Sequence, residues 1–128
     1  LPNGAGGYQL GDGNLTEVVI GTQAAPIAKT AAATLTPAEL ANGIITYAGA
    51  AVNLTMPLGA DIDAAFSSMK VNSCFDFFII NTGSNTATVT GNTGVTLVGV
   101  AAVATVTSCQ WRARKSGDAT YVFNRVAG

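Results

Sequence analysis

Polar and apolar side chains alternate along much of the second half of the chain. In residues 109–114 the odd positions hold Cys, Trp and Ala and the even positions hold Gln, Arg and Arg, which predicts a strand that buries Trp111 and exposes Arg112 and Arg114. Residues 86–90 alternate Thr with Ala or Val in the same way. The pattern therefore indicates β-strands that each turn one face toward a core.

One segment departs from this alternation. Residues 74–80 are apolar on both sides of the chain except for Asp76, and such a run predicts a central strand with a sheet or helix over each face. A carboxylate in such a strand needs a partner. We therefore expect Asp76 to form a structural ion pair with an arginine of the C-terminal strands.

Turn-forming residues interrupt the strands at regular intervals. These signals are Asn-Thr-Gly at 81–83, Gly-Asn-Thr-Gly at 91–94 and Lys-Ser-Gly-Asp at 115–118. They predict an antiparallel sheet built from hairpins, with a further strand at 95–98 and a last strand at 120–126 that closes a terminal hairpin. Residues 100–107 fit either a strand or a broad turn.

Short strands are also predicted in the first half of the chain. They lie at residues 16–20, 27–30, 44–47 and 52–56. Ile27 and Lys29 share one side of the second of these strands, so we expect it at a sheet edge. Pro57 ends the last of them.

Two short helices are expected among these strands. Thr36-Pro37-Ala38-Glu39 has the spacing of a capping box with proline at the first helical position, so a helix should run to Asn42 and end at Gly43. Between residues 59 and 69, apolar side chains recur at helical spacing. They are Ile62, Ala65, Phe66 and Met69.

The sequence thus predicts a mainly β protein, an antiparallel β-sandwich of jelly-roll-like form with one or two short helices. A single domain would cover residues 15–128, preceded by an extended glycine-rich N-terminal arm at 1–14. Two interpretations of the arm stay open. It is either a mobile terminus or an extension that orders on a neighbouring subunit through Leu1, Tyr8 and Leu10.

Composition narrows the functional classes. Charged residues make up 10% of the 128-residue chain, against ~25% in ordinary soluble proteins, so we expect copies of the chain or a partner to cover much of its surface. A net charge of −1 disfavours a nucleic-acid partner. Polar residues recur throughout the apolar segments, which disfavours a membrane span. The C-terminal end is locally basic, either as a solvated face or as a contact for an acidic partner.

Residues suited to catalysis or metal binding are scarce. Histidine is absent, which excludes a histidine-based triad and a Cys/His metal site, so we expect no enzyme activity and no cofactor. Cys74 and Cys109 could pair across strands, although small buried hydrophobes are the favoured interpretation. Asp61 and Asp63 fit the start of a helix better than a calcium site or an acid/base pair, because no further carboxylates accompany them.

Three stretches of the sequence resemble a module of tailed-bacteriophage structural proteins. They are LTPAELANGIITY, FDFFIINTGSNTATVTGNTGVTLVG, and WRARKSG followed by YVFNRV. The resemblance covers about residues 35–126 and leaves the arm outside. Where the family often has Arg-Val-Arg, this chain has Arg112-Ala113-Arg114, and Cys74 and Cys109 are not part of the family pattern.

The resemblance implies a virion protein, either a capsid decoration (cement) protein or a fibre-head or tail-tip domain that recognises a cell-surface glycan. The first is favoured: a homotrimer bound to the major capsid protein on the capsid exterior. No secretory signal is evident in LPNGAGGYQLGDGN, so we expect assembly in the host cytoplasm. The predicted contact residues are Leu1, Tyr8 and Leu10 in the arm and Arg112 and Arg114 on the sheet.

Overall fold

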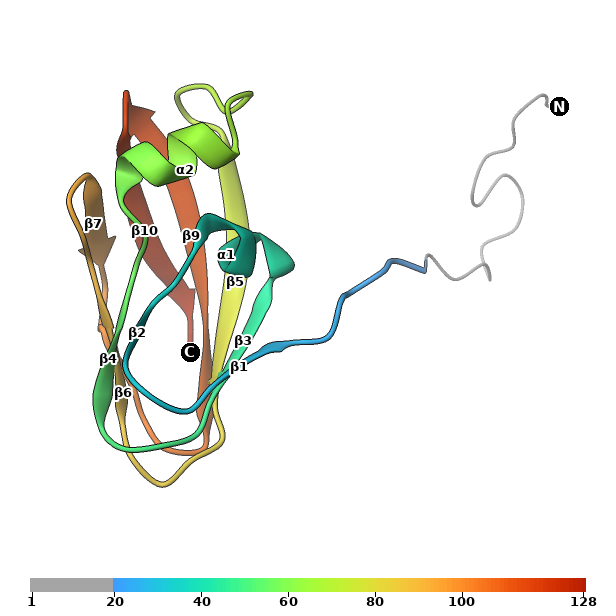
Figure 1. The fold of residues 1–128 in the computed structure, drawn as a ribbon, viewed down its shortest axis with the longest axis vertical. Helices are drawn as coiled ribbons and strands as arrows, with labels where there is room; N and C mark the ends of the chain where they lie inside the picture. Colours follow the sequence, from blue (N-terminus) through green and yellow to red (C-terminus); the bar gives the residue numbers. More distant parts are fainter. Residues whose placement is uncertain (1–19) are drawn as a thin grey trace, which may run out of the picture.

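The computed structural model describes residues 20–128, which form two β-sheets packed face to face (Figure 1). In chain order the elements are β1 (Ile27–Lys29), β2 (Ala33–Thr34), α1 (Pro37–Asn42), β3 (Ile44–Tyr47), β4 (Val52–Thr55), α2 (Gly59–Ala65), β5 (Cys74–Asn81), β6 (Ala87–Thr90), β7 (Val95–Val98), β8 (Ala102–Val103), β9 (Thr107–Gly117) and β10 (Thr120–Ala127). The predicted mainly β class with short helices is confirmed. The predicted arm at 1–14 and residues 16–19 of the first predicted strand lie outside the described residues.

The chain alternates between the two sheets from β1 to β9. The six-stranded sheet has the order β1-β3-β5-β9-β10-β7 and the four-stranded sheet the order β2-β4-β6-β8. Among β1 to β6, strands two apart in the sequence are neighbours, and β1, β3 and β5 run parallel, as do β2, β4 and β6. β1 lies at an edge of its sheet, as predicted.

The expectation of antiparallel hairpins throughout is wrong. Only the β5–β9, β9–β10 and β6–β8 pairs are antiparallel, and β7 joins β10 in parallel. Residues 91–94 do not form a hairpin, since they carry the chain from β6 in one sheet to β7 in the other. Turn residues mark where a strand ends, but they do not reveal whether the chain turns back within its sheet or crosses to the facing one.

The terminal hairpin is confirmed, with a shorter turn than predicted. β9 extends through Lys115 to Gly117, so that Asp118 and Ala119 alone connect it to β10. Ala119 has a positive φ of 50°. A tight two-residue connection of this kind requires such left-handed backbone.

Both helices lie where the chain passes from the four-stranded to the six-stranded sheet (Figure 1). The capping box of α1 is confirmed: Thr36 Oγ1 accepts from the Glu39 amide at 3.2 Å, and Glu39 Oε1 accepts from the Thr36 amide at 3.0 Å. α2 ends at Ala65, earlier than predicted, and Ala65 is exposed. Phe66 and Met69 still pack against the core from the loop that follows.

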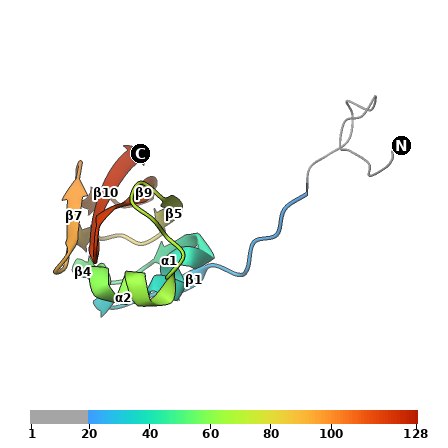
Figure 2. The same ribbon diagram turned by 90° about the horizontal axis from the view of Figure 1, so that it is seen from above.

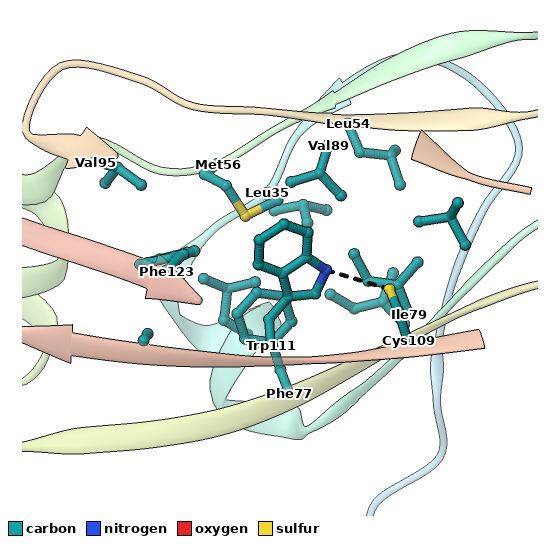
Figure 3. Close-up of a cluster of buried hydrophobic side chains, with 14 of the residues drawn as sticks. Leu35, Leu54, Met56, Phe77, Ile79, Val89, Val95, Cys109, Trp111 and Phe123 are labelled. Carbon is teal, nitrogen blue, oxygen red and sulfur yellow. Dashed lines mark hydrogen bonds between the residues drawn. The ribbon is translucent and has the colours of Figure 1, made fainter. Parts of the chain in front are cut away.

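Aromatic side chains from the six-stranded sheet fill the space between the sheets. Trp111 is fully buried, as predicted, and the rings of Phe77 and Phe123 meet edge to face with centroids 5.6 Å apart. Figure 3 shows Leu54 and Val89 of the four-stranded sheet facing these rings. Alternation along each strand therefore builds one continuous core.

Candidate functional site

The outer face of the six-stranded sheet is an extended surface that no other part of the described chain covers in the region of β5, β9 and β10. It consists of the side chains that alternate with the core residues on β3, β5, β9 and β10: Ile44, Thr46, Cys74, Asp76, Phe78, Ile80, Ser108, Gln110, Arg112, Arg114, Val122 and Asn124. Figure 2 shows no helix or strand laid over β5, β9 and β10 on this side. We call this surface the outer face.

The prediction that β5 is covered on both sides is wrong. Phe77 and Ile79 are buried in the core, whereas Phe78, which points the other way, is 42% exposed. Ile44, opposite Phe78 in the β3–β5 register, and Ile80 are half-buried. An apolar run that ordinarily indicates a strand buried on two sides here leaves one apolar side open.

An ion pair occupies the middle of the outer face. Arg112 donates to both carboxylate oxygens of Asp76, from Nε to Oδ1 at 2.7 Å and from Nη2 to Oδ2 at 2.9 Å, and Gln110 Nε2 donates to Oδ2 at 3.2 Å. The Arg112 guanidinium holds the pKa of the Asp76 carboxyl below its ordinary value. The predicted ion pair of Asp76 with a C-terminal arginine is confirmed. The charges of Asp76 and Arg112 therefore already neutralise each other in bidentate geometry.

The other basic residues of the C-terminal strands are also engaged. Arg114 donates from Nη1 to Asn72 Oδ1 at 3.0 Å, and Lys115 Nζ lies 2.9 Å from Asp63 Oδ1. Arg125 donates to main-chain oxygens. Of these three cations, Lys115 alone meets a side-chain carboxylate of the described residues, whereas Arg114 and Arg125 bond to amide and main-chain oxygens.

The structure brings two of the five predicted contact residues together. Arg112 and Arg114 lie two positions apart on β9, with both side chains on the outer face. Leu1, Tyr8 and Leu10 lie outside the described residues. Sequence reasoning missed Phe78 as a surface residue. The signal was present in the apolar run, but only the arrangement of the sheets determines which side is covered.

Asp63, predicted only as a residue of the first helical turn, links α2 to β9, to β10 and to the turn between them. It accepts hydrogen bonds from the Tyr121 hydroxyl at 2.6 Å and the Ala119 amide at 2.8 Å, in addition to its pairing with Lys115. The Tyr121 hydroxyl, followed by Lys115 and the Ala119 amide, lowers the pKa of Asp63 to about 2. Asp61 does lie in the first turn of α2, as predicted.

The described region shows no cluster of metal-ligating side chains. Among residues 20–128 no three His, Cys, Asp or Glu side chains gather in a way that would hold a metal ion. Both cysteines are free thiols: Cys109 is buried as predicted, whereas Cys74 is exposed because it lies on the outer face. Tyr47 and Tyr121 are buried.

Comparison with protein-family models, with curated proteins and with solved structures finds no match to this chain. No helix within residues 20–128 combines the length and apolar character needed to cross a membrane. Fold and surface together define the class as a small two-sheet β domain. Its outer sheet face combines apolar side chains such as Phe78 with polar ones and carries the Asp76–Arg112 ion pair, a composition that suits contact with another macromolecule.

Proposed function

We propose that this chain is a structural protein of a tailed-bacteriophage virion, a capsid decoration (cement) protein. In this role it binds the major capsid protein from outside, as a homotrimer, and stabilises the head without catalysing a reaction. The resemblance of residues 35–126 to phage structural modules suggests that the protein is part of a virion. The observation that carries the role is the outer face, with Phe78 exposed beside a neutralised Asp76–Arg112 pair.

A surface of this composition suits permanent contact with a protein lattice. Exposed apolar area favours burial against a partner. Charges that are already paired before binding cost less free energy to desolvate than unpaired charges do. Each contact can be of ordinary size, because symmetry repeats it over the whole shell. Phe78, Ile44 and Ile80 would supply the apolar contact, and Arg112 and Arg114 its polar border.

The alternative is a fibre-head or tail-tip domain that recognises a glycan. Sugar sites usually offer an exposed aromatic ring beside amides or carboxylates. Trp111, Tyr47 and Tyr121 are all buried, so their rings are not accessible to a sugar. Phe78 is exposed, but the Asp76 carboxylate near it already accepts hydrogen bonds from the Gln110 amide and from Arg112. The decoration role therefore has the better support.

Binding to heads tests the proposal. Heads would be purified from a phage whose copy of the gene is deleted, and the full chain added back while its dissociation constant and the temperature of DNA release are measured. Phe78→Lys should weaken binding at least about tenfold, because it forces a charge into an apolar contact. The matched control is Asn53→Lys, an exposed position on β4 of the other sheet, which should bind as the wild type does.

Two results would contradict the proposal. One is wild-type chain that neither binds the heads nor raises the temperature of DNA release. The other is Phe78→Lys and Asn53→Lys chains that bind equally well. Failure to bind heads combined with binding to a glycan array would favour the fibre-head alternative.

A further inference from the structure

A groove with apolar walls lies at the end of the molecule where β10 finishes. It runs between residues 99–107 and the last residues of the chain, 125–128, is open to solvent, and has a volume of about 580 Å³. Val100 and Val126 form part of its lining, and they are 67% and 48% exposed. A volume of this size falls within the roughly 300–1,000 Å³ of ordinary ligand pockets.

Exposed valines are concentrated around this groove. Val98 precedes its first lining residue, and Val106 lies between the lining residues Ala104 and Thr107. Val106 is 81% exposed and has a φ of 56°, which is costly for a β-branched residue. Folding stability alone would favour glycine or asparagine at such a position, and an exposed apolar side chain there suits a contact with a partner.

Arg125 places a positive charge in the groove. Its Nη1 donates to the main-chain oxygens of Val100 at 2.8 Å and Ala102 at 2.6 Å, and Nη2 donates to that of Gly128 at 3.2 Å. These bonds use three of the five guanidinium hydrogens. No side-chain carboxylate of residues 20–128 lies within ion-pairing distance of Arg125. The groove therefore fits an extended segment that combines apolar side chains with a carboxylate.

The first 19 residues of this chain have that chemistry. Their only charged side chains are Asp12 and Glu17. Tyr8, Leu10 and Asp12 alternate with other residues, so an extended backbone would turn two apolar side chains and one carboxylate to the same side. We propose that the groove receives the segment Tyr8–Asp12 of a second copy of the chain, with Leu10 between Val100 and Val126 and the Asp12 carboxylate against Arg125.

The path of the chain favours an arm from a second copy, rather than from the same copy, as the occupant of the groove, because the chain enters β1 at the sheet edge away from the groove. β1 forms one edge of the six-stranded sheet, and β10 lies next to the opposite edge. Residues 20–26, which lead into β1, are all exposed. Gln23 and Ala25 are hydrogen-bonded to Asn42, and toward residue 20 the segment leaves the body in both views (Figures 1 and 2).

The reach of the arm is sufficient for this exchange. Nineteen extended residues span roughly 60 Å, several times the radius of gyration of about 13 Å expected for a domain of this size. Arms passed from each copy to the next form a head-to-tail contact, which closes into a ring when the rotation permits. A trimer is the smallest such ring beyond a dimer.

This inference deepens the proposed function, on which its biological purpose rests, but it is tested on the isolated protein in solution. A photoreactive amino acid would replace Leu10 in the full chain, and equal amounts of unlabelled and ¹⁵N-labelled protein would be mixed before illumination. Mass spectrometry should find crosslinks from position 10 to residues 98–104 or 125–128 that join labelled to unlabelled copies. Crosslinks confined to single copies, crosslinks to other surfaces, or no crosslinks would overturn the inference.

Charge reversal in the arm supplies a second measurement with a matched control. Asp12→Lys should weaken self-association, measured by light scattering over a range of concentrations, at least about tenfold, because it sets two positive charges together. Glu17→Lys makes the same change five residues away and should associate as the wild type does. Val126→Glu, which places a carboxylate on the groove wall, should weaken association as well.

Equal association of Asp12→Lys and wild type, or a monomeric wild type, would overturn the inference. A monomer that still binds heads would leave the decoration role standing. A chain that forms the arm-linked ring but fails to bind heads would retain the groove contact and reject the decoration role. The two proposals therefore fail in distinguishable ways.

Discussion

The indole nitrogen of Trp111 donates a hydrogen bond to Sγ of Cys109 at 3.2 Å, two positions back on the same face of β9 (Figure 3). Both side chains are buried, and this bond gives the indole N–H its partner inside the core. Burial raises the pKa of the Cys109 thiol, so this sulfur remains protonated and unreactive at neutral pH. Cys109 therefore serves the core as a hydrogen-bond acceptor as well as a small apolar side chain.

Replacing Cys109 should destabilise the fold through this bond. Cys109→Val keeps an apolar side chain of similar size but leaves the indole N–H without a partner, at an expected cost of about 1–3 kcal/mol in the free energy of unfolding. Urea denaturation measures the loss. Cys74→Val, on the exposed outer face, should change stability by less than about 0.5 kcal/mol. Equal effects of the two substitutions would show that the bond contributes nothing.

Gly59 is required by a close approach of three segments. A Cβ at this position would lie 2.0 Å from the Ala119 carbonyl oxygen, and one at Gly94 would lie 2.3 Å from the same atom. We expect Gly59→Ala to lower the free energy of unfolding by several kcal/mol, or to prevent folding, because backbone must move to admit the methyl group. Thermal unfolding followed by circular dichroism measures this change.

A matched glycine provides the control for that substitution. Gly21 has no neighbour within 4 Å of an added Cβ, so Gly21→Ala should leave the unfolding temperature unchanged. If Gly59→Ala unfolds at the wild-type temperature, the contact between α2 and the β9–β10 turn is looser than the structure indicates.

Stability should fall in acid through Asp63. The pKa of this carboxyl is about 2 in the folded chain and 3.8 as a free group, so its contribution is fully present above pH 3.8 and is lost as the pH falls toward 2. Asp63→Asn should lower stability at neutral pH and flatten the pH dependence in that window. Denaturation midpoints collected between pH 2 and 7 provide the comparison.

Asp61→Asn is the control, since Asp61 is exposed in the same helix. Its profile should keep the wild-type slope between pH 4 and 2. An unchanged slope in Asp63→Asn would assign the acid sensitivity to other carboxylates.

Val106 should be a site where substitution stabilises the protein. Its φ of 56° suits glycine or asparagine better than a β-branched residue, so Val106→Gly should raise the free energy of unfolding by about 1 kcal/mol. Thr105→Gly, one position earlier at a residue without positive φ, should give no gain. A loss of stability in both variants would refute the interpretation of strain. A gain in stability with weaker self-association would link this valine to the groove.

Local patterns in the sequence correctly predicted features that depend on neighbouring residues. Thr36 and Glu39 form the capping box because both partners lie within one turn of helix. Trp111 points inward and Arg112 outward because a strand alternates its side chains whatever it pairs with. The partnership of Asp76 with a C-terminal arginine followed from the rarity of an unpaired carboxylate in a sheet.

Those local patterns could not predict which distant segments of the chain pair with each other. Thr-Gly and Asn-Gly turns end strands equally well in a hairpin and in a crossing between sheets, so the parallel arrangement of β1, β3 and β5 left no mark in the turn residues. For the same reason the sequence did not reveal that Phe78 would be exposed. It also gave no sign that Asp63 would meet Tyr121 across 58 positions of chain.

The amino-acid sequence by itself indicated most of the longer strands, where the helices begin and which side of each alternating strand is apolar, because backbone geometry and side-chain alternation act over a few residues. It did not predict the short strand β2 and left open whether the segment that holds β8 is a strand. Tertiary structure alone decided which strands are neighbours, which apolar side stays open as the outer face, and that the last residues of β10 enclose a groove around Arg125. Those outcomes depend on how two sheets pack against each other. Packing is a property of the whole chain, and no short stretch of sequence specifies it.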